Sequence, residues 1–202
     1  MVRKLVGIAV FTAVVCAANP SWTKDGPEQH AGFFLRLTYG LGLAGTDLKG
    51  NPDDTAFFGL SGLSLFSIGG AVTDNLILSL DTFGTSSNKP MVKLNGAKQD
   101  DNYDTSTRGI GPGFTYYFMP LNLYLSGSIG VAFSGITPPT GKDQNSEVGW
   151  AFNLAFGKEW WASDNWGLGL GLQLFYARMP MKAIDGHVST LAGGLLLTAT
   201  YN

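Results

Sequence analysis

His187 and Ser189 stand two residues apart in the segment HVS, close to the end of the 202-residue chain. In an extended strand such residues point to the same face, so the imidazole and the hydroxyl lie side by side. These are the residue types of nucleophilic acyl transfer, which also needs an acid that orients the imidazole. The final segment contains no acid, although Asp47 or Asp185 could take that place. We expect His187 to be a plain residue at the rim of the fold, and hydrolysis remains an alternative.

Arg36 and Asp81 form the second pair of interest. Both lie in segments of strict period-two alternation, on the face opposite the large apolar side chains and at similar distances from the same end. Because a lone buried charge is costly, each makes sense chiefly as the partner of the other. We therefore predict an Arg36–Asp81 ion pair in the interior of the fold. The same parity places these further polar residues inside: Asn122, Tyr124, Asn153, Glu159 and Gln173.

No motif indicates a cofactor or a metal. The letters GLGLAG at 40–45 match the dinucleotide fingerprint, but the turn-forming segment TDLKGNPDD follows where that motif requires a helix. The segment DDNYD at 100–104 has alternate oxygen ligands, but Thr105 and Gly111 occupy the positions where a calcium loop needs Gly and Glu. With two histidines and one cysteine in the chain, a transition-metal site is not expected.

The elements that must position these residues are strands. In NLYLSGSIGVAF, residues 122–133, large apolar residues alternate with small or polar ones, which is the pattern of a strand whose faces meet different surroundings. Eight such segments can be read: 31–44, 56–70, 75–84, 106–118, 121–137, 147–161, 165–178 and 187–201. An even number is what a closed up-and-down bacterial barrel requires.

The connections between these segments alternate in length. Tight turns such as GAVTDN, MPLN and ASDN follow the second, fourth and sixth segments, whereas long polar connections follow the odd ones. Short turns at one rim and long loops at the other are the arrangement of an outer-membrane barrel, with the loops outside the cell.

Charge distribution separates a membrane barrel from a soluble one. Charged residues make up 14% of the chain, and the stretches 109–137, 148–157, 165–177 and 188–201 contain none. A soluble strand normally turns charged residues to water, so the Gly, Ser, Thr and Asn of the second face suit a lumen better. The formal net charge of −2 gives no basic patch that would bind nucleic acid.

The N-terminal segment indicates export. Arg3 and Lys4 precede an apolar core and the small residues Cys16, Ala17 and Ala18, which is the order of a secretory signal peptide. We expect residues 1–18 to be removed, residues 19–30 to form a short periplasmic tail and residues 31–202 to form the barrel. Cleavage there would leave a chain without thiols, since Cys16 is the only cysteine.

Aromatic residues collect near the ends of the expected strands. Rings with a polar handle prefer the headgroup level of a bilayer, so two girdles are predicted. The residues assigned to the membrane interface are Phe33, Phe118, Trp150, Trp160, Trp166, Tyr176 and Tyr201.

Taken with the signal peptide, the turn and strand AVTDNLILSL and the final segment LAGGLLLTATYN, these features resemble the small eight-stranded outer-membrane barrels of the OmpA, OmpX and OmpW type. The resemblance covers nearly all of the mature chain and concerns architecture. It implies an all-β, eight-stranded antiparallel up-and-down transmembrane barrel in the cell outer membrane. It also implies contact with outer-membrane lipids and lipopolysaccharide, and assembly by the barrel-assembly machinery, which in this class reads a terminal aromatic residue; here Tyr201 is penultimate.

For function, we expect a monomeric, non-enzymatic barrel with a structural or surface-interaction role carried by its outer loops. A first alternative is a narrow pore or a passage for a small hydrophobic ligand, as in the OmpW type. A second is a lipid A deacylase, because the pair His187 and Ser189 resembles the His-x-Ser of those enzymes, in which Ser is the nucleophile and His the base.

Overall fold

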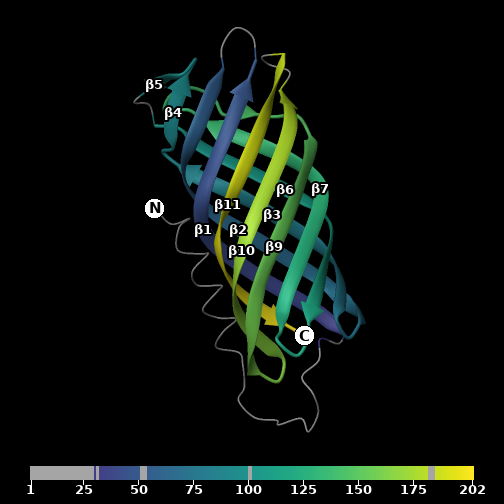
Figure 1. Ribbon diagram of the computed structural model, residues 1–202. Coiled ribbons are helices and arrows are strands. Elements are labelled where there is room, and N and C mark those ends of the chain that lie inside the picture. The colour runs from purple at the N-terminus through teal and green to yellow at the C-terminus, as the bar shows by residue number, and fades with distance from the viewer. Residues whose placement is uncertain (1–29, 31, 51–53, 100–101, 182–184) are drawn as a thin grey trace.

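The computed structural model describes residues 30, 32–50, 54–99, 102–181 and 185–202. Eight long antiparallel strands form one ring, which closes because β1 pairs with both β2 and β11 (Figure 1). The eight strands are β1 (Phe33–Lys49), β2 (Thr55–Thr73), β3 (Leu76–Asn88), β6 (Asp104–Phe118), β7 (Leu123–Thr137), β9 (Gly149–Ser163), β10 (Trp166–Met181) and β11 (Gly186–Tyr201). The predicted fold class and strand number are therefore confirmed, and the described residues contain no helix that could cross a membrane.

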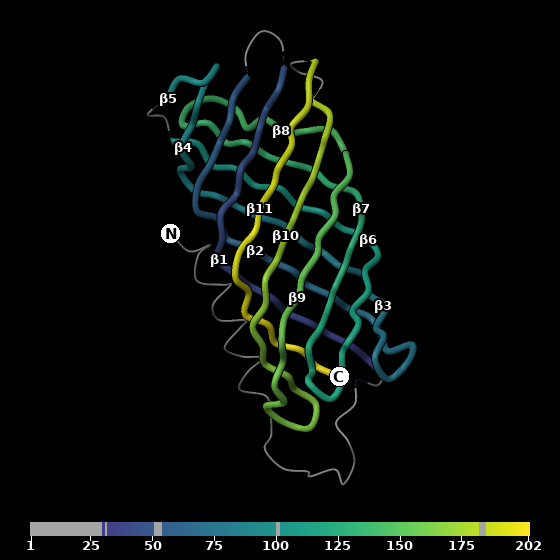
Figure 2. Tube along the Cα trace, viewed as in Figure 1, coloured from purple at the N-terminus to yellow at the C-terminus, as the bar shows by residue number. Residues whose placement is uncertain are grey.

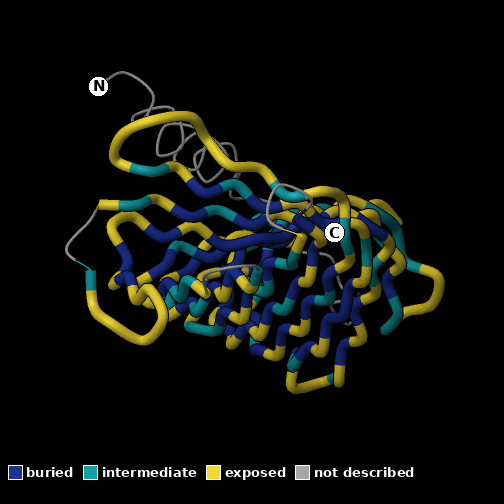
Figure 3. The backbone as a smooth tube through the Cα atoms, turned by 90° about the horizontal axis from the view of Figure 1, so that it is seen from above, coloured by how far each residue is buried: buried dark blue, intermediate teal, exposed yellow. Residues whose placement is uncertain are grey.

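Period-two alternation gives each strand one face inside the ring and one outside. Viewed from above, buried and exposed residues alternate along every strand (Figure 3). Large apolar side chains occupy the outside, as shown by Leu195 and Ile129 with exposed fractions of 69% and 61%. Charged and polar groups such as Arg36 and Glu159 are fully buried on the inside. We call the two faces the outer wall and the lumen; their polarity is the reverse of a soluble barrel.

The two ends of the barrel differ in their connections. The turns β2–β3, β6–β7 and β9–β10 lie together at what we call the short-turn end, which also holds the C-terminus (Figure 2). At the opposite loop end, the β3–β6 connection forms a hairpin of β4 (Met91–Leu94) and β5 (Ala97–Gln99) that extends the sheet from β2. A short strand, β8 (Gln144–Asn145), pairs with β7. The β10–β11 connection is shorter than expected, because both strands continue further toward this end.

Close contact between strands explains one pair of glycines. Gly111 of β6 and Gly130 of β7 face each other so closely that a Cβ at either position would overlap the backbone carbonyl of the neighbouring strand. Glycine permits this approach and the strong coiling of a small barrel.

The N-terminal predictions fall mostly outside the described residues. The expected signal peptide, 1–18, and all of the expected tail except its last residue lie there. That last residue, His30, is described, and it is buried against the barrel.

Candidate functional site

The lumen is crossed near the short-turn end by a polar cluster, here called the lumen cluster: Arg36, Thr115, Tyr117, Glu159, Thr198 and Thr200. Arg36 Nη2 lies 3.2 Å from Glu159 Oε1, with both side chains fully buried. The Arg36 guanidinium also donates to Thr115, Tyr117 and Thr200. β1 and β11 are neighbours in the ring, whereas β6 and β9 are separated from them by other strands, so the cluster joins strands across the interior.

Glu159 is the acceptor at the centre of this cluster. Its carboxylate accepts from Tyr117 Oη at 2.9 Å, from Thr200 Oγ1 at 2.7 Å and from Thr198 Oγ1 at 3.3 Å, in addition to the guanidinium. A buried ion pair is tolerated only when further hydrogen bonds satisfy both charges, and here both are satisfied.

The prediction that Arg36 forms an ion pair with Asp81 is wrong. Arg36 and Asp81 do lie at the same level, each paired in register with Ser67 of β2. However, Asp81 turns away and accepts a hydrogen bond from Ser128, over Gly113, where a Cβ would overlap the carboxylate. Arg36 is long enough to reach the far wall, where Glu159 offers a carboxylate with three further donors. Alternation along the sequence predicts that Glu159 lies in the lumen, where it is buried, but does not predict this role.

The other predicted lumen residues are also buried. Asn153 accepts a hydrogen bond from Gln173, and the Tyr124 ring lies under the Arg36 guanidinium, 4.2 Å from its carbon to the ring centroid. Cationic guanidinium groups are attracted to aromatic faces, so Tyr124 adds to the stabilisation of the buried charge.

His30 closes the short-turn end, a role that the sequence did not reveal. Its ring stacks on Tyr117 with centroids 3.4 Å apart and lies 5.1 Å from the Trp161 ring. Its Nε2 is 2.8 Å from Asn122 Oδ1 in the β6–β7 turn. Burial lowers the pKa of His30 from its ordinary value of 6.5, and the hydrogen bond to Asn122 opposes this only in part.

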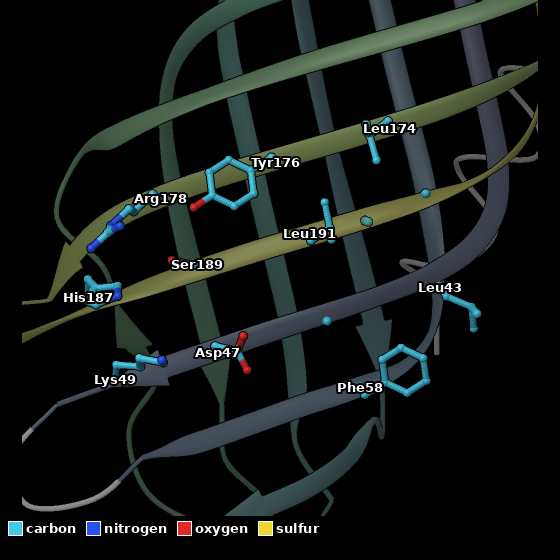
Figure 4. A pocket seen from close by; sticks show the side chains of 13 residues that line it. Leu43, Asp47, Lys49, Phe58, Leu174, Tyr176, Arg178, His187, Ser189 and Leu191 are labelled. Carbon is cyan, nitrogen blue, oxygen red and sulfur yellow. The ribbon is translucent and has the colours of Figure 1, made fainter.

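A second feature lies on the outer wall at the loop end. A groove of about 710 Å³, here called the outer groove, runs over β1, β10 and β11 and is bordered by Phe58 of β2 (Figure 4). Its polar half is formed by Asp47, Lys49, Arg178, His187 and Ser189, and its apolar half by Leu43, Leu174 and Leu191.

Strand register fixes the order within the polar half. Ser189 of β11 is directly opposite Asp47 on one side and Arg178 on the other. His187 is opposite Lys49. The structure therefore brings His187 and Ser189 together with Asp47, one of the two acids considered from sequence, whereas Asp185 does not line the groove. The side chains of His187, Ser189 and Asp47 form no hydrogen bond with one another.

The aromatic residues assigned to the membrane interface lie on the outer wall at both ends of the barrel. At the short-turn end, Tyr201 lies between Phe33 and Trp166, with ring centroids 6.3 and 5.4 Å away. Toward the loop end, Trp150 and Tyr176 are 5.5 Å apart. Phe118, the last residue of β6, and Trp160, near the end of β9, project outward.

No family model and no curated protein matches the sequence. Solved structures similar to the chain include OprG from Pseudomonas aeruginosa, with 11% identity, a TM-score of 0.49, and coverage of 88% of this chain and 100% of that chain. The outer-membrane protease OmpT from Escherichia coli shows 6% identity, a TM-score of 0.48 and coverage of 91% and 99%. Ail from Yersinia pestis shows 11% identity, a TM-score of 0.40 and coverage of 83% and 99%. By its own closed ring of eight strands and its apolar outer wall, the chain is a small β-barrel of the outer-membrane type.

Proposed function

We propose that the protein is an integral outer-membrane barrel with a sealed lumen and a structural or surface-interaction role presented at its loop end. The observation that carries this proposal is the lumen cluster, in which Arg36 and Glu159 bridge the walls of the barrel. An eight-stranded barrel has an interior that side chains can fill or that can hold one small ligand, and here the side chains of the lumen cluster occupy it near the short-turn end. The cluster therefore argues against the alternative of a pore or ligand passage.

The loop end is the part that remains free to meet partners. The β4–β5 hairpin extends the sheet beyond the ring, and it carries exposed polar side chains such as Lys93. Binding residues are commonly carried on loops that a rigid scaffold positions, and here the scaffold is the barrel.

Cysteine labelling in intact cells tests this orientation, starting from a Cys16→Ser background that has no other thiol. A membrane-impermeant maleimide should label Lys93→Cys at the loop end. It should not label Asp164→Cys in the β9–β10 turn until the outer membrane is permeabilised. Labelling of Asp164→Cys in intact cells would place the short turns outside and contradict the proposal.

A second candidate function is ester hydrolysis on a lipid in the outer groove. One observation favours it: Asp47 lies beside Ser189 in the same groove as His187, which completes the residue types of an acyl-transfer site. The test is the mass spectrum of lipid A from cells that express the protein. Loss of an acyl chain that is abolished by both His187→Ala and Ser189→Ala would establish the activity, and an unchanged spectrum would exclude it.

A further inference from the structure

The outer groove carries two cationic side chains on a wall that is mostly apolar. Lys49 and Arg178 are exposed at its polar half, and neither lies within 4.0 Å of a carboxylate among the described residues. Asp47 is the acid among the lining residues. Two cations gathered in one groove, without an ion-pair partner from the protein, are complementary to an anionic ligand.

Beside these charged residues, the apolar half of the groove contains two glycines, and we call this part the furrow. In register, Gly45 lies opposite Leu191 and Gly193 lies opposite Leu43, so each missing side chain sits beside a large apolar one. A Cβ at Gly45 would meet only the Phe58 ring, at 3.8 Å, which shows that the space above this glycine is open. The furrow is thus apolar and leads directly to the charged half.

We propose that the outer groove binds one phosphorylated saccharolipid of the outer leaflet, with a phosphate at Arg178 and Lys49 and an acyl chain in the furrow. The planar guanidinium of Arg178 suits a phosphate, to which it can donate two parallel hydrogen bonds. Ser189 and Asp47, in the same row, offer a hydroxyl and a carboxylate to the hydroxyl groups of a sugar. The site goes beyond the surface-interaction role, and it requires no hydrolysis.

Native mass spectrometry of the folded protein, released from detergent micelles containing bis-phosphorylated lipid A, tests the site. We expect one bound lipid, and at least about tenfold weaker retention for Arg178→Gln, since that variant loses the charge-assisted hydrogen bonds to the phosphate. Arg108→Gln is the matched control, because Arg108 is also an exposed arginine but lies on β6, away from the groove. Equal weakening by both variants would mean nonspecific charge attraction and would overturn the proposal.

Two further measurements separate the parts of the ligand. Gly45→Leu fills the furrow without changing charge, and we expect it to weaken retention as much as Arg178→Gln does. Lipid A without its phosphates should bind the wild type as weakly as intact lipid A binds Arg178→Gln. If the dephosphorylated lipid is retained as well as the intact one, phosphate is not recognised and the proposal is wrong. Retention of the lipid with its mass unchanged by the wild type distinguishes binding from the hydrolysis considered above.

Discussion

Removing the carboxylate of Glu159 should be among the most destabilising single changes in the barrel. Glu159→Ala leaves the Arg36 guanidinium buried without a counter-charge, and it removes the acceptor of Tyr117, Thr198 and Thr200. Breaking a buried ion pair from one side costs about 3–5 kcal/mol, because the remaining charge stays buried. We therefore expect the free energy of unfolding to fall by about 3–5 kcal/mol.

The assay is urea unfolding of the protein refolded in phosphatidylcholine vesicles, followed by tryptophan fluorescence, in a double-mutant cycle. Arg36→Met alone should cost less than Glu159→Ala, because Glu159 keeps three donors. The cycle of Arg36→Met with Glu159→Ala should give a coupling energy of about 2 kcal/mol or more, and the cycle with Asp81→Asn less than about 0.5 kcal/mol. A larger coupling to Asp81 than to Glu159 would refute the assignment of the lumen cluster.

Three smaller predictions follow from single contacts. Tyr117→Phe removes the hydroxyl that links Arg36 to Glu159 and should lower the free energy of unfolding by about 1–3 kcal/mol in the same assay. Burial lowers the pKa of His30, so the docked ring favours its neutral form. We therefore expect docking of this ring to weaken as pH falls below about 6.5. Trp161 fluorescence should report the change, and the His30→Gln variant should not show it. Gly111→Ala should destabilise by about 1–3 kcal/mol through backbone overlap, whereas Gly45→Ala should change the free energy by less than about 0.5 kcal/mol; equal effects would contradict the packing described.

Alternation along the sequence was sufficient to predict the barrel and the face on which most residues lie. A strand has a strict period of two, so one correctly assigned residue fixes the direction of all its neighbours. This is why Asn153, Glu159 and Gln173 could be placed in the lumen, where the structure has them buried. The loop-end hairpin β4–β5 was not predicted, since KPMVKLNGAKQ is polar and shows no alternation long enough to stand out.

Pairing across the lumen could not be predicted in the same way. The sequence gives the level of a side chain along its strand, but contact between opposite walls depends on side-chain length and on the empty space left by residues such as Gly113. Arg36 therefore reached Glu159 instead of Asp81. Likewise, nothing in the sequence around His30 indicated that this ring would stack on Tyr117.

Strands β1 and β11 contribute to the lumen cluster with their inner face and to the outer groove with their outer face. Inside, Arg36 and Glu159 are buried and paired with each other, whereas outside, Lys49 and Arg178 are exposed among apolar side chains. A buried network of this kind stabilises one arrangement of the barrel, and exposed cations are available for a ligand.

Single-channel conductance of the refolded protein in a planar bilayer tests the sealed lumen most directly. With folding confirmed by heat-dependent gel mobility, we expect the wild type to be silent. The double variant Arg36→Ala with Glu159→Ala, which removes the side chains that bridge the walls, should give discrete conductance steps. Discrete steps in the wild type that the double variant leaves unchanged would show that ions pass the lumen cluster freely, and the sealed-barrel account would then be wrong.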